Sequence, residues 1–215
     1  MPLDDFQTEV ATIALGLPSA GNLVLVGGAA MLAYGLVDRP TYDIDLFTAE
    51  QEDVAAVAAD LERALTTRGY SVQVQREHIS FVALTVQKHD GRSLDVEIAY
   101  DARIRPPTRL HIGNVAHLEE LAADKVLALF DRAEPWDLVD VDALASRFGL
   151  QRLMALAREK DGGFDQAVFA GALRVAASQP DARFAAIGVH HERLDELRRE
   201  AVAWVTQIIQ DQPPA

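Results

Sequence analysis

The chain has 215 residues, of which 49% are hydrophobic, so it can bury a sizeable core as one domain or as one α/β domain with a helical appendage. Its formal net charge of −13 argues against a general affinity for DNA or RNA, because neutralising phosphates needs surplus lysine and arginine, although a local basic patch could still bind one nucleic acid. The absence of cysteine excludes disulfides, thiolate metal sites and cysteine nucleophiles, and it fits a cytoplasmic location.

No apolar run is long enough to span a bilayer, and the acidic N-terminus lacks the basic start of a signal peptide, so we expect no membrane association. Asp4 or Asp5 can cap a first helix that runs to about Leu17. A buried strand at 23–26, the pair Gly27-Gly28 and a helix at 29–36 follow. This order predicts a strand, a tight turn and a helix, with backbone N–H groups at the turn that can bind a phosphate.

A second strand is predicted at 42–46, where apolar and acidic residues alternate. The alternation points Tyr42, Ile44 and Leu46 to one face and both Asp43 and Asp45 to the other. Side chains on the same face are about 6.5–7 Å apart along a strand, close enough for a divalent cation and a bound triphosphate to engage both carboxylates.

After a helix at 49–68, short strands are predicted at 71–76, 80–88 and 93–100, with a hairpin turn at 89–92 between the last two. A small mixed or antiparallel sheet is therefore expected. The strand at 93–100 repeats the acidic layout, with Asp95 and Glu97 on one face. Either residue alone could equally belong to a solvated strand face.

The next segment, 102–110, is locally basic through Arg103, Arg105 and Arg109, and its two prolines favour an extended loop or an edge. It could flank the active site and touch triphosphate or RNA, or it could be an ordinary surface loop. A helix at 115–133 places Lys125 and Arg132 on one face, where charged side chains usually face solvent. Further helices are predicted from about residue 136 to the C-terminus, with breaks at 161–163 and at Pro180.

Two groups of residues resemble the signatures of a known family. Gly27-Gly28 followed by Arg39-x-Thr41-x-Asp43-Ile44-Asp45 resembles the signature of the polymerase-β-like nucleotidyltransferase superfamily, in particular its AbiEii/AbiGii-type toxin branch. The second signature of that branch resembles the run Lys125, Ala128, Arg132, Asp137, Asp140. Trp136 departs from it, because a basic residue is expected there. The resemblance covers about residues 21–145.

The resemblance implies an α/β (α+β) fold, with a nucleotidyltransferase-like short mixed sheet flanked by helices and a helical C-terminal extension. We expect a nucleotidyltransferase core over 1–114 and a helical region over 115–215 that completes the site and packs on the core. The implied activity is Mg²⁺-dependent transfer of a nucleoside monophosphate from an NTP to an acceptor hydroxyl, with release of pyrophosphate. A toxin of a toxin–antitoxin pair would use a tRNA end as acceptor, through the local basic patch, and would have a cognate antitoxin as partner.

The resemblance also implies a role for each matching residue. Asp43, Asp45 and Asp95 would hold two Mg²⁺ ions, with Glu97 as the alternative to Asp95. Gly27 and Gly28 would let the backbone approach the phosphates, and Thr41 would bind the nucleotide. Arg39 and Lys125 would neutralise phosphate charge, and Arg132 and Asp137 would orient Lys125 or the nucleotide.

Two other functions stay open at this point. A small cationic molecule such as an aminoglycoside, or a protein side chain, could be the acceptor, and the overall acidity suits a cationic acceptor better than RNA. A nucleotide-binding or interaction module with a degraded site would explain Trp136 and the unproven third carboxylate. Magnesium-dependent NTP turnover separates that module from both enzymes.

Overall fold

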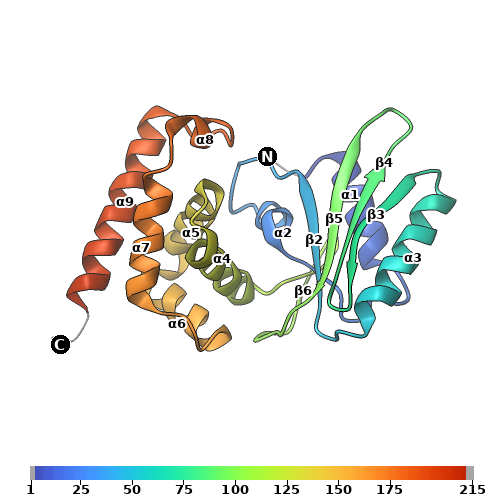
Figure 1. Cartoon of the computed structure of the whole chain (residues 1–215), viewed down its shortest axis with the longest axis horizontal. Coiled ribbons are helices and arrows are strands. Elements are labelled where there is room, and N and C mark those ends of the chain that lie inside the picture. The colour runs from blue at the N-terminus through green and yellow to red at the C-terminus, as the bar shows by residue number, and fades with distance from the viewer. Residues whose placement is uncertain (1–2, 212–215) are drawn as a thin grey trace. The chain divides into compact units, whose positions relative to one another are not determined.

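The computed structural model describes residues 3–211, which form two compact units (Figure 1). Unit 1 comprises the residues up to Gly35 together with Thr41–His117, and unit 2 comprises Leu36–Pro40 together with the residues from Leu118 onward. The chain thus leaves unit 1 for the short segment 36–40 and returns to it before the strand that carries Asp43. The predicted domain limits, 1–114 and 115–215, stay a prediction, because compact units need not fold independently.

Unit 1 is built on a mixed sheet of seven strands in the order β3-β4-β5-β2-β1-β7-β6. The strands are β1 (Val24–Leu25), β2 (Asp43–Thr48), β3 (Ser71–His78), β4 (Phe81–Gln87), β5 (Ser93–Tyr100), β6 (Thr108–Leu110) and β7 (Gly113–Val115). The β2–β5 and β1–β7 pairs are parallel and the other pairs are antiparallel. The sheet therefore places β2 and β5, the two strands with paired acidic residues, side by side.

Helices α1 (Asp5–Leu15) and α3 (Asp53–Thr67) pack against each other and against the sheet (Figure 1). The apolar residues that alternate along the central strands are buried, as are those at helical spacing on α3: Ile44, Leu46, Val54, Val57, Leu61, Leu65, Val82, Leu84, Val86, Leu94, Val96 and Ile98. Because the side chains of a strand alternate between faces, the acidic residues of β2 and β5 lie on the other face, which we call the carboxylate face.

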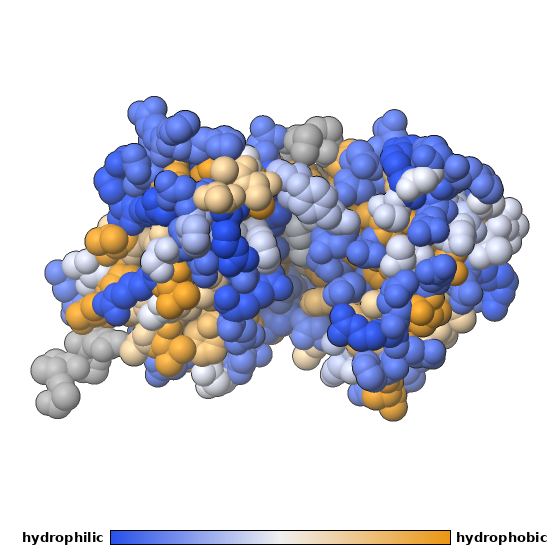
Figure 2. Space-filling view, turned by 45° about the horizontal axis from the view of Figure 1, so that its top comes forward, coloured by the Kyte–Doolittle hydropathy of each residue, from blue (hydrophilic) through white to orange (hydrophobic). Residues whose placement is uncertain are grey.

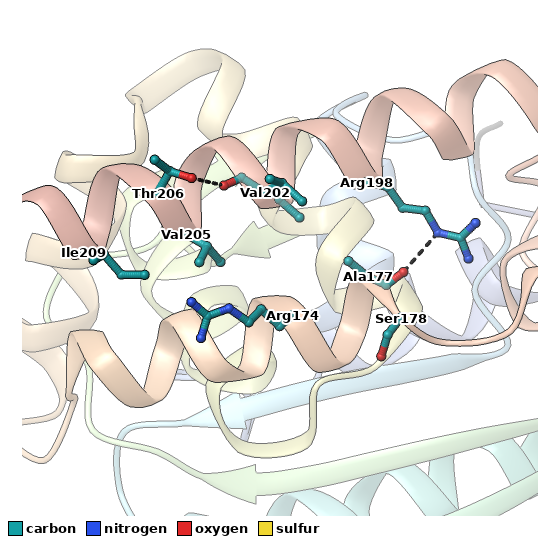
Figure 3. Close-up of a pocket in the computed structure, with 9 residues that line it drawn as sticks. Arg174, Ala177, Ser178, Arg198, Val202, Val205, Thr206 and Ile209 are labelled. Atoms are coloured by element: carbon teal, nitrogen blue, oxygen red, sulfur yellow. Dashed lines mark hydrogen bonds between the residues drawn. The ribbon is translucent and has the colours of Figure 1, made fainter.

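Unit 2 is helical and contains α4 (Leu118–Arg132), α5 (Pro135–Phe148), α6 (Leu150–Lys160), α7 (Gln166–Ala177), α8 (Asp181–Ala185) and α9 (His191–Gln210). The side chain of Asp165 caps α7 by accepting hydrogen bonds from the backbone of Ala167 and Val168. Helices α7 and α9 lie side by side and border a groove of about 510 Å³ (Figure 3). The groove is lined largely by aliphatic side chains such as Val202 and Val205 and by no carboxylate, so it does not suit a magnesium site.

Much of the face seen in Figure 2 is hydrophilic, but α7 and α9 carry exposed apolar residues, two of which, Val202 and Ile209, line the groove between these helices. They include Val168, Val175, Val202 and Ile209, which are exposed over 51–65% of their surface. None of the described helices combines the length and the apolar character that crossing a membrane requires.

The structure confirms the predicted fold class, a short mixed sheet flanked by helices with a helical C-terminal part. Two local predictions were wrong. Tyr42 precedes β2 instead of pointing into the core from it, and it is 71% exposed, because the strand begins only at Asp43. The helix after the glycine pair, α2 (Gly27–Ala33), begins on the glycines themselves and ends before Gly35, whose φ of +67° breaks the helix.

Candidate active site

Gly27 lies against the carboxylate of Asp45. Its φ is +64°, in the left-handed region that favours glycine, and a Cβ atom added there would stand 1.9 Å from Asp45 Oδ2. The backbone N–H of Val26, one residue earlier, donates to the backbone carbonyl of Asp45 at 3.0 Å. The glycine turn and the second aspartate of β2 are therefore packed directly together, and a larger residue at position 27 would have to displace the Asp45 side chain.

Four carboxylates share the carboxylate face, because β2 and β5 are parallel and in register. Asp43 pairs with Asp95 and Asp45 pairs with Glu97. Neighbouring strands are about 4.8 Å apart, so each pair brings two acidic side chains close together. Asp43 and Asp95 are exposed, whereas Asp45 and Glu97 are partly buried. Both candidates for the third carboxylate thus lie on the predicted face, with Asp95 beside Asp43.

Threonine hydroxyls orient the two exposed aspartates. Thr41 Oγ1 donates to Asp43 Oδ1 at 2.9 Å, and Thr85 Oγ1 of β4 donates to Asp95 Oδ1 at 2.8 Å. The Oδ2 atom of each aspartate makes no hydrogen bond or ion pair with another residue in 3–211. Each aspartate is thereby held by one oxygen and offers the other to a ligand. Thr85 was not predicted as part of the site.

Helix α1 fixes the segment that leads into β2. Asp4 and Gln7 form a capping box at the N-terminus of α1, and the amide of Gln7 also donates to the backbone carbonyl of Thr41 at 2.8 Å. Gln7 is buried, so this bond is shielded from water. A residue of the first helix therefore positions the threonine that orients Asp43.

The donor set of the carboxylate face fits Mg²⁺. Asp43, Asp45, Asp95 and Glu97 offer only carboxylate oxygens, the hard ligands that Mg²⁺ takes, and magnesium sites commonly use one or two such groups with water and substrate phosphates. Because Gly27 has no Cβ, the Asp45 carboxylate can lie directly against the glycine turn. We therefore propose Asp43, Asp45 and Asp95, the ligands predicted from the sequence, as the residues that would hold the metal.

In unit 2, Arg39 and Lys125 bind one buried aspartate. Arg39 donates through Nε to Asp140 Oδ1 at 2.7 Å and through Nη2 to Asp140 Oδ2 at 2.6 Å, and Lys125 Nζ lies 2.7 Å from the same Oδ2. The exposed fraction is 8% for Arg39, 5% for Lys125 and 0% for Asp140. The usual solvent-facing position of a helical lysine does not apply here, because Lys125 has a buried anionic partner.

Asp140 belongs to the second signature but has no role in the site predicted from sequence. The sequence did contain a pattern that could have indicated Asp140, because Asp137, Asp140, Val141 and Leu144 recur at the spacing of one helix face. In the structure all four are buried. Aspartates on an apolar face need cationic partners, and the structure supplies them.

Arg132 and Asp137 form a second ion pair in unit 2, with Nε–Oδ2 at 2.7 Å and Nη2–Oδ1 at 2.8 Å. Asp137 is fully buried, whereas the Arg132 side chain is 54% exposed. Trp136 lies under the guanidinium of Arg183, whose Cζ is 5.9 Å from the ring centre, and Arg183 also binds Glu134. The ring that replaces the expected basic residue is thus engaged within unit 2.

The sequence matches the profile described as "Nucleotidyl transferase AbiEii toxin, Type IV TA system" over residues 17–211. The chain belongs to the AbiEii nucleotidyltransferase toxin family. This AbiEii protein is therefore a nucleotidyltransferase of the toxin–antitoxin class, and the family implies an NTP substrate and an antitoxin partner. No curated protein matches the chain.

Solved structures with a similar fold include JHP933 from Helicobacter pylori, which is 19% identical, with a TM-score of 0.59 over 96% of this chain and 90% of that chain. MenT4, a nucleotidyltransferase toxin from Mycobacterium tuberculosis, is 18% identical, with a TM-score of 0.57 over 97% of this chain and 84% of that chain. At these identities the likeness establishes the fold of the AbiEii protein and not its acceptor.

The arginines of the predicted basic patch differ in their contacts within the AbiEii protein. Arg103 donates through Nη2 to the backbone carbonyls of Asn22 at 2.6 Å and Phe47 at 3.1 Å, so it holds the ends of two segments together. Arg105 donates to the carbonyl of Ile104 next to it. Arg109 is exposed on the edge strand β6 and donates weakly to Asn114 at 3.4 Å. Arg109 is therefore the member of the patch best placed to meet a nucleic acid.

Proposed function

We propose that this AbiEii protein transfers a nucleoside monophosphate from an NTP to a hydroxyl at the end of an RNA, tRNA in the first instance, in a Mg²⁺-dependent reaction. The observation that carries the proposal is the register of β2 and β5, which sets Asp95 beside Asp43 and leaves one oxygen of each available. Asp45, packed against Gly27, completes the set.

Asp43, Asp45 and Asp95 would hold the metal. When bound, Mg²⁺ ions at such a site neutralise the triphosphate and stabilise both the attacking and the leaving oxygen. The protein's own part is to position these carboxylates before substrate arrives: the hydroxyls of Thr41 and Thr85 hold Asp43 and Asp95, and Asp45 is packed against Gly27.

In the transfer, the acceptor oxygen forms a bond to the α-phosphorus, and the bond from that phosphorus to the bridging oxygen breaks. Pyrophosphate leaves with the electron pair. The acceptor proton goes to Asp95, the exposed carboxylate on the far side of Asp43 from the glycine turn. Gly27 and Gly28 let the backbone approach the phosphates.

Lys125 and Arg39 keep their proposed role, which is to neutralise phosphate charge, and Asp140 gains the role of positioning Lys125. The ammonium group of lysine has three N–H donors, of which Asp140 takes one in the structure. Asp140 would thus hold Lys125 in place while the other donors serve the nucleotide. Arg132 and Asp137, which bind each other, orient the nucleotide or the neighbouring Lys125.

The test is to incubate the protein with each α-labelled NTP and total cellular RNA, with and without EDTA. We expect label to enter a tRNA-sized product with one preferred NTP and to be lost on chelation. Absence of labelled RNA would reject RNA as the acceptor. Labelling of an aminoglycoside in its place would favour the small cationic acceptor, to which the net charge of −13 is better suited.

A further inference from the structure

A pocket of about 350 Å³ opens on the carboxylate face of unit 1, directly beside the candidate site. Asp95 and Glu97 of β5 line one end, Thr85 of β4 lines the middle, and Gln75 and Arg76 of β3 line the other end. The pocket is therefore anionic next to the proposed catalytic carboxylate and cationic at the edge of the sheet. This arrangement suits a ligand with a hydroxyl at one end and a negative group at the other.

Arg76 supplies the cationic end. The register pairs Arg76 with Ala83 and Ala83 with Glu97, which places all three on the carboxylate face. The guanidinium lies over the ring of Phe81, with Cζ 5.5 Å from the ring centre. Within residues 3–211 the Arg76 side chain makes no hydrogen bond or ion pair, so its N–H donors are available to an oxyanion.

The strand order separates this pocket from the glycine turn. In the sequence β3-β4-β5-β2-β1, the glycine turn follows β1, whereas the pocket extends from β5 to β3. Transfer of a phosphoryl group needs the attacking and leaving oxygens roughly in line with the phosphorus. If the leaving pyrophosphate lies toward Gly27, the acceptor comes from the opposite side, which is the side of the pocket.

We propose that this pocket binds the acceptor strand, with Arg76 on the phosphate that precedes the terminal ribose and Gln75 and Thr85 beside that ribose. The inference rests on the proposed function and deepens it, because it assigns the acceptor a binding site on the protein. Two strand spacings, about 10 Å, separate β5 from β3, a span that one terminal nucleotide with its phosphate and a long arginine side chain can bridge. Arg76 would repel a cationic group at its own end of the pocket, whereas Asp95 and Glu97 would attract one at theirs.

The experiment compares Arg76→Ser with Arg68→Ser. Arg68 lies at the C-terminal end of α3, a helix on the other side of the sheet, and donates only to the carbonyl of Ala64 in its own helix, so its loss removes the same charge away from the pocket. With an RNA oligonucleotide bearing a free 3′ hydroxyl, Arg76→Ser should raise the KM for RNA about 3- to 10-fold and leave the KM for NTP within about twofold. Arg68→Ser should change neither constant.

A binding titration separates this inference from the proposed function. The titration uses an Asp43→Asn background, where no transfer is expected. Replacing Arg76 by Ser there should reduce the slope of RNA affinity against salt concentration by the amount that about one phosphate contact contributes. Loss of that contact would support the pocket independently of turnover, whereas absence of transfer by the wild-type protein would reject the proposed reaction and leave the pocket in place. The inference would be overturned if the Arg76 and Arg68 substitutions had equal effects on RNA binding. It would also be overturned if Arg76→Ser bound a cationic aminoglycoside more tightly and bound RNA as before.

Discussion

Gly27 and Gly35 have nearly the same left-handed backbone, with φ of +64° and +67°, but their surroundings differ. Nothing lies within 4 Å of a Cβ added at Gly35, whereas the same atom at Gly27 would meet the Asp45 carboxylate. The two positions therefore separate the energetic cost of the backbone from the cost of the close contact.

We predict that Gly35→Ala lowers the free energy of unfolding by about 1–2 kcal/mol, because it forces an L-residue into the left-handed region, and that Gly27→Ala lowers it further, because its Cβ also meets Asp45. Only Gly27→Ala should also abolish nucleotidyl transfer, since it must displace Asp45. Urea unfolding and labelled-NTP turnover measure the two effects. Full activity in Gly27→Ala would contradict a catalytic role for the position of Asp45.

Asp43 and Asp45 are predicted to be essential for transfer but not for the fold. Asp43→Asn and Asp45→Asn each remove a proposed metal ligand and little packing, so turnover should be lost while the melting temperature stays unchanged or rises as acidic repulsion is relieved. Glu52→Gln, an exposed carboxylate before α3, serves as control and should keep wild-type activity. Wild-type turnover in both aspartate variants would reject the two-metal reaction.

We predict that Asp140 mainly controls the stability of the protein and that Lys125 mainly controls its catalytic rate. Asp140→Asn leaves two buried cations with a neutral partner and should destabilise the protein by about 3–5 kcal/mol. Lys125→Met keeps the two-bond pair between Arg39 and Asp140, so it should cost less stability.

The catalytic effect of Lys125→Met should nevertheless be large, with kcat/KM for the NTP reduced about 100-fold or more. Denaturant unfolding and steady-state kinetics on the same preparations test both expectations. Lys125→Arg should not restore the rate fully, since a guanidinium cannot take the place of a compact ammonium beside Asp140. An unchanged kcat/KM in folded Lys125→Met would restrict Lys125 to a stabilising role.

How far the site could be predicted from sequence depends on the kind of residue. Strand alternation, a local rule, assigned Asp43 and Asp45 to one face of their strand and Asp95 and Glu97 to one face of theirs. The structure adds that the two strands are neighbours, so that all four lie on the carboxylate face. The partners of Arg39 and Lys125 could not be predicted, because the bond to Asp140 joins residues 101 positions apart in the case of Arg39. Periodicity carries no information about such distant pairs.

Among the elements, α1 connects two parts of the sheet. Its Phe6 ring stacks on Tyr70, just before β3, with ring centres 5.6 Å apart, while Gln7 binds the carbonyl of Thr41 before β2. The sequence predicted both α1 and α3 as helices. It could not predict the bond from α1 to the carbonyl of Thr41, because that bond comes from the single polar side chain of Gln7.

Burial, aided by the Glu9 carboxylate that accepts a hydrogen bond from the phenol, raises the pKa of Tyr70 to about 12 from its ordinary value of 10.0. A raised pKa in the folded state means that the stabilising contribution is complete below pH 10 and is lost as the pH rises toward 12. We predict a fall in unfolding free energy over this window that is smaller in Tyr70→Phe. Urea titrations from pH 9 to pH 11.5 measure it, and identical slopes in both proteins would contradict the assignment.

At the scale of the whole molecule, the two units are interleaved in the sequence. Leu36–Pro40 belongs to unit 2 although the residues on both sides belong to unit 1, and Arg39 in this segment binds Asp140 of α5. A fragment that starts at Leu118 therefore lacks one of the two cations that bind the buried Asp140.

We predict that the fragment from Leu118 onward is less helical and less stable than the same residues in the intact chain. Adding the segment 36–40 through a flexible linker at its N-terminus should recover part of the loss, and the same fusion with Arg39→Gln should recover less. Circular dichroism and thermal melting of the three fragments measure this. Equal stability of all three would show that the ion pair is dispensable to unit 2.

The long separation of Arg39 and Asp140 also sets an order of events during synthesis. At about 5–20 residues per second, a ribosome makes Asp140 roughly 5–20 s after Arg39. During that interval the guanidinium of Arg39 lacks its carboxylate partner, and Lys125 is also made before their shared anion. The segment 36–40 can bind Asp140 only once α5 has left the ribosome, so a nascent toxin completes this buried ion cluster late in translation.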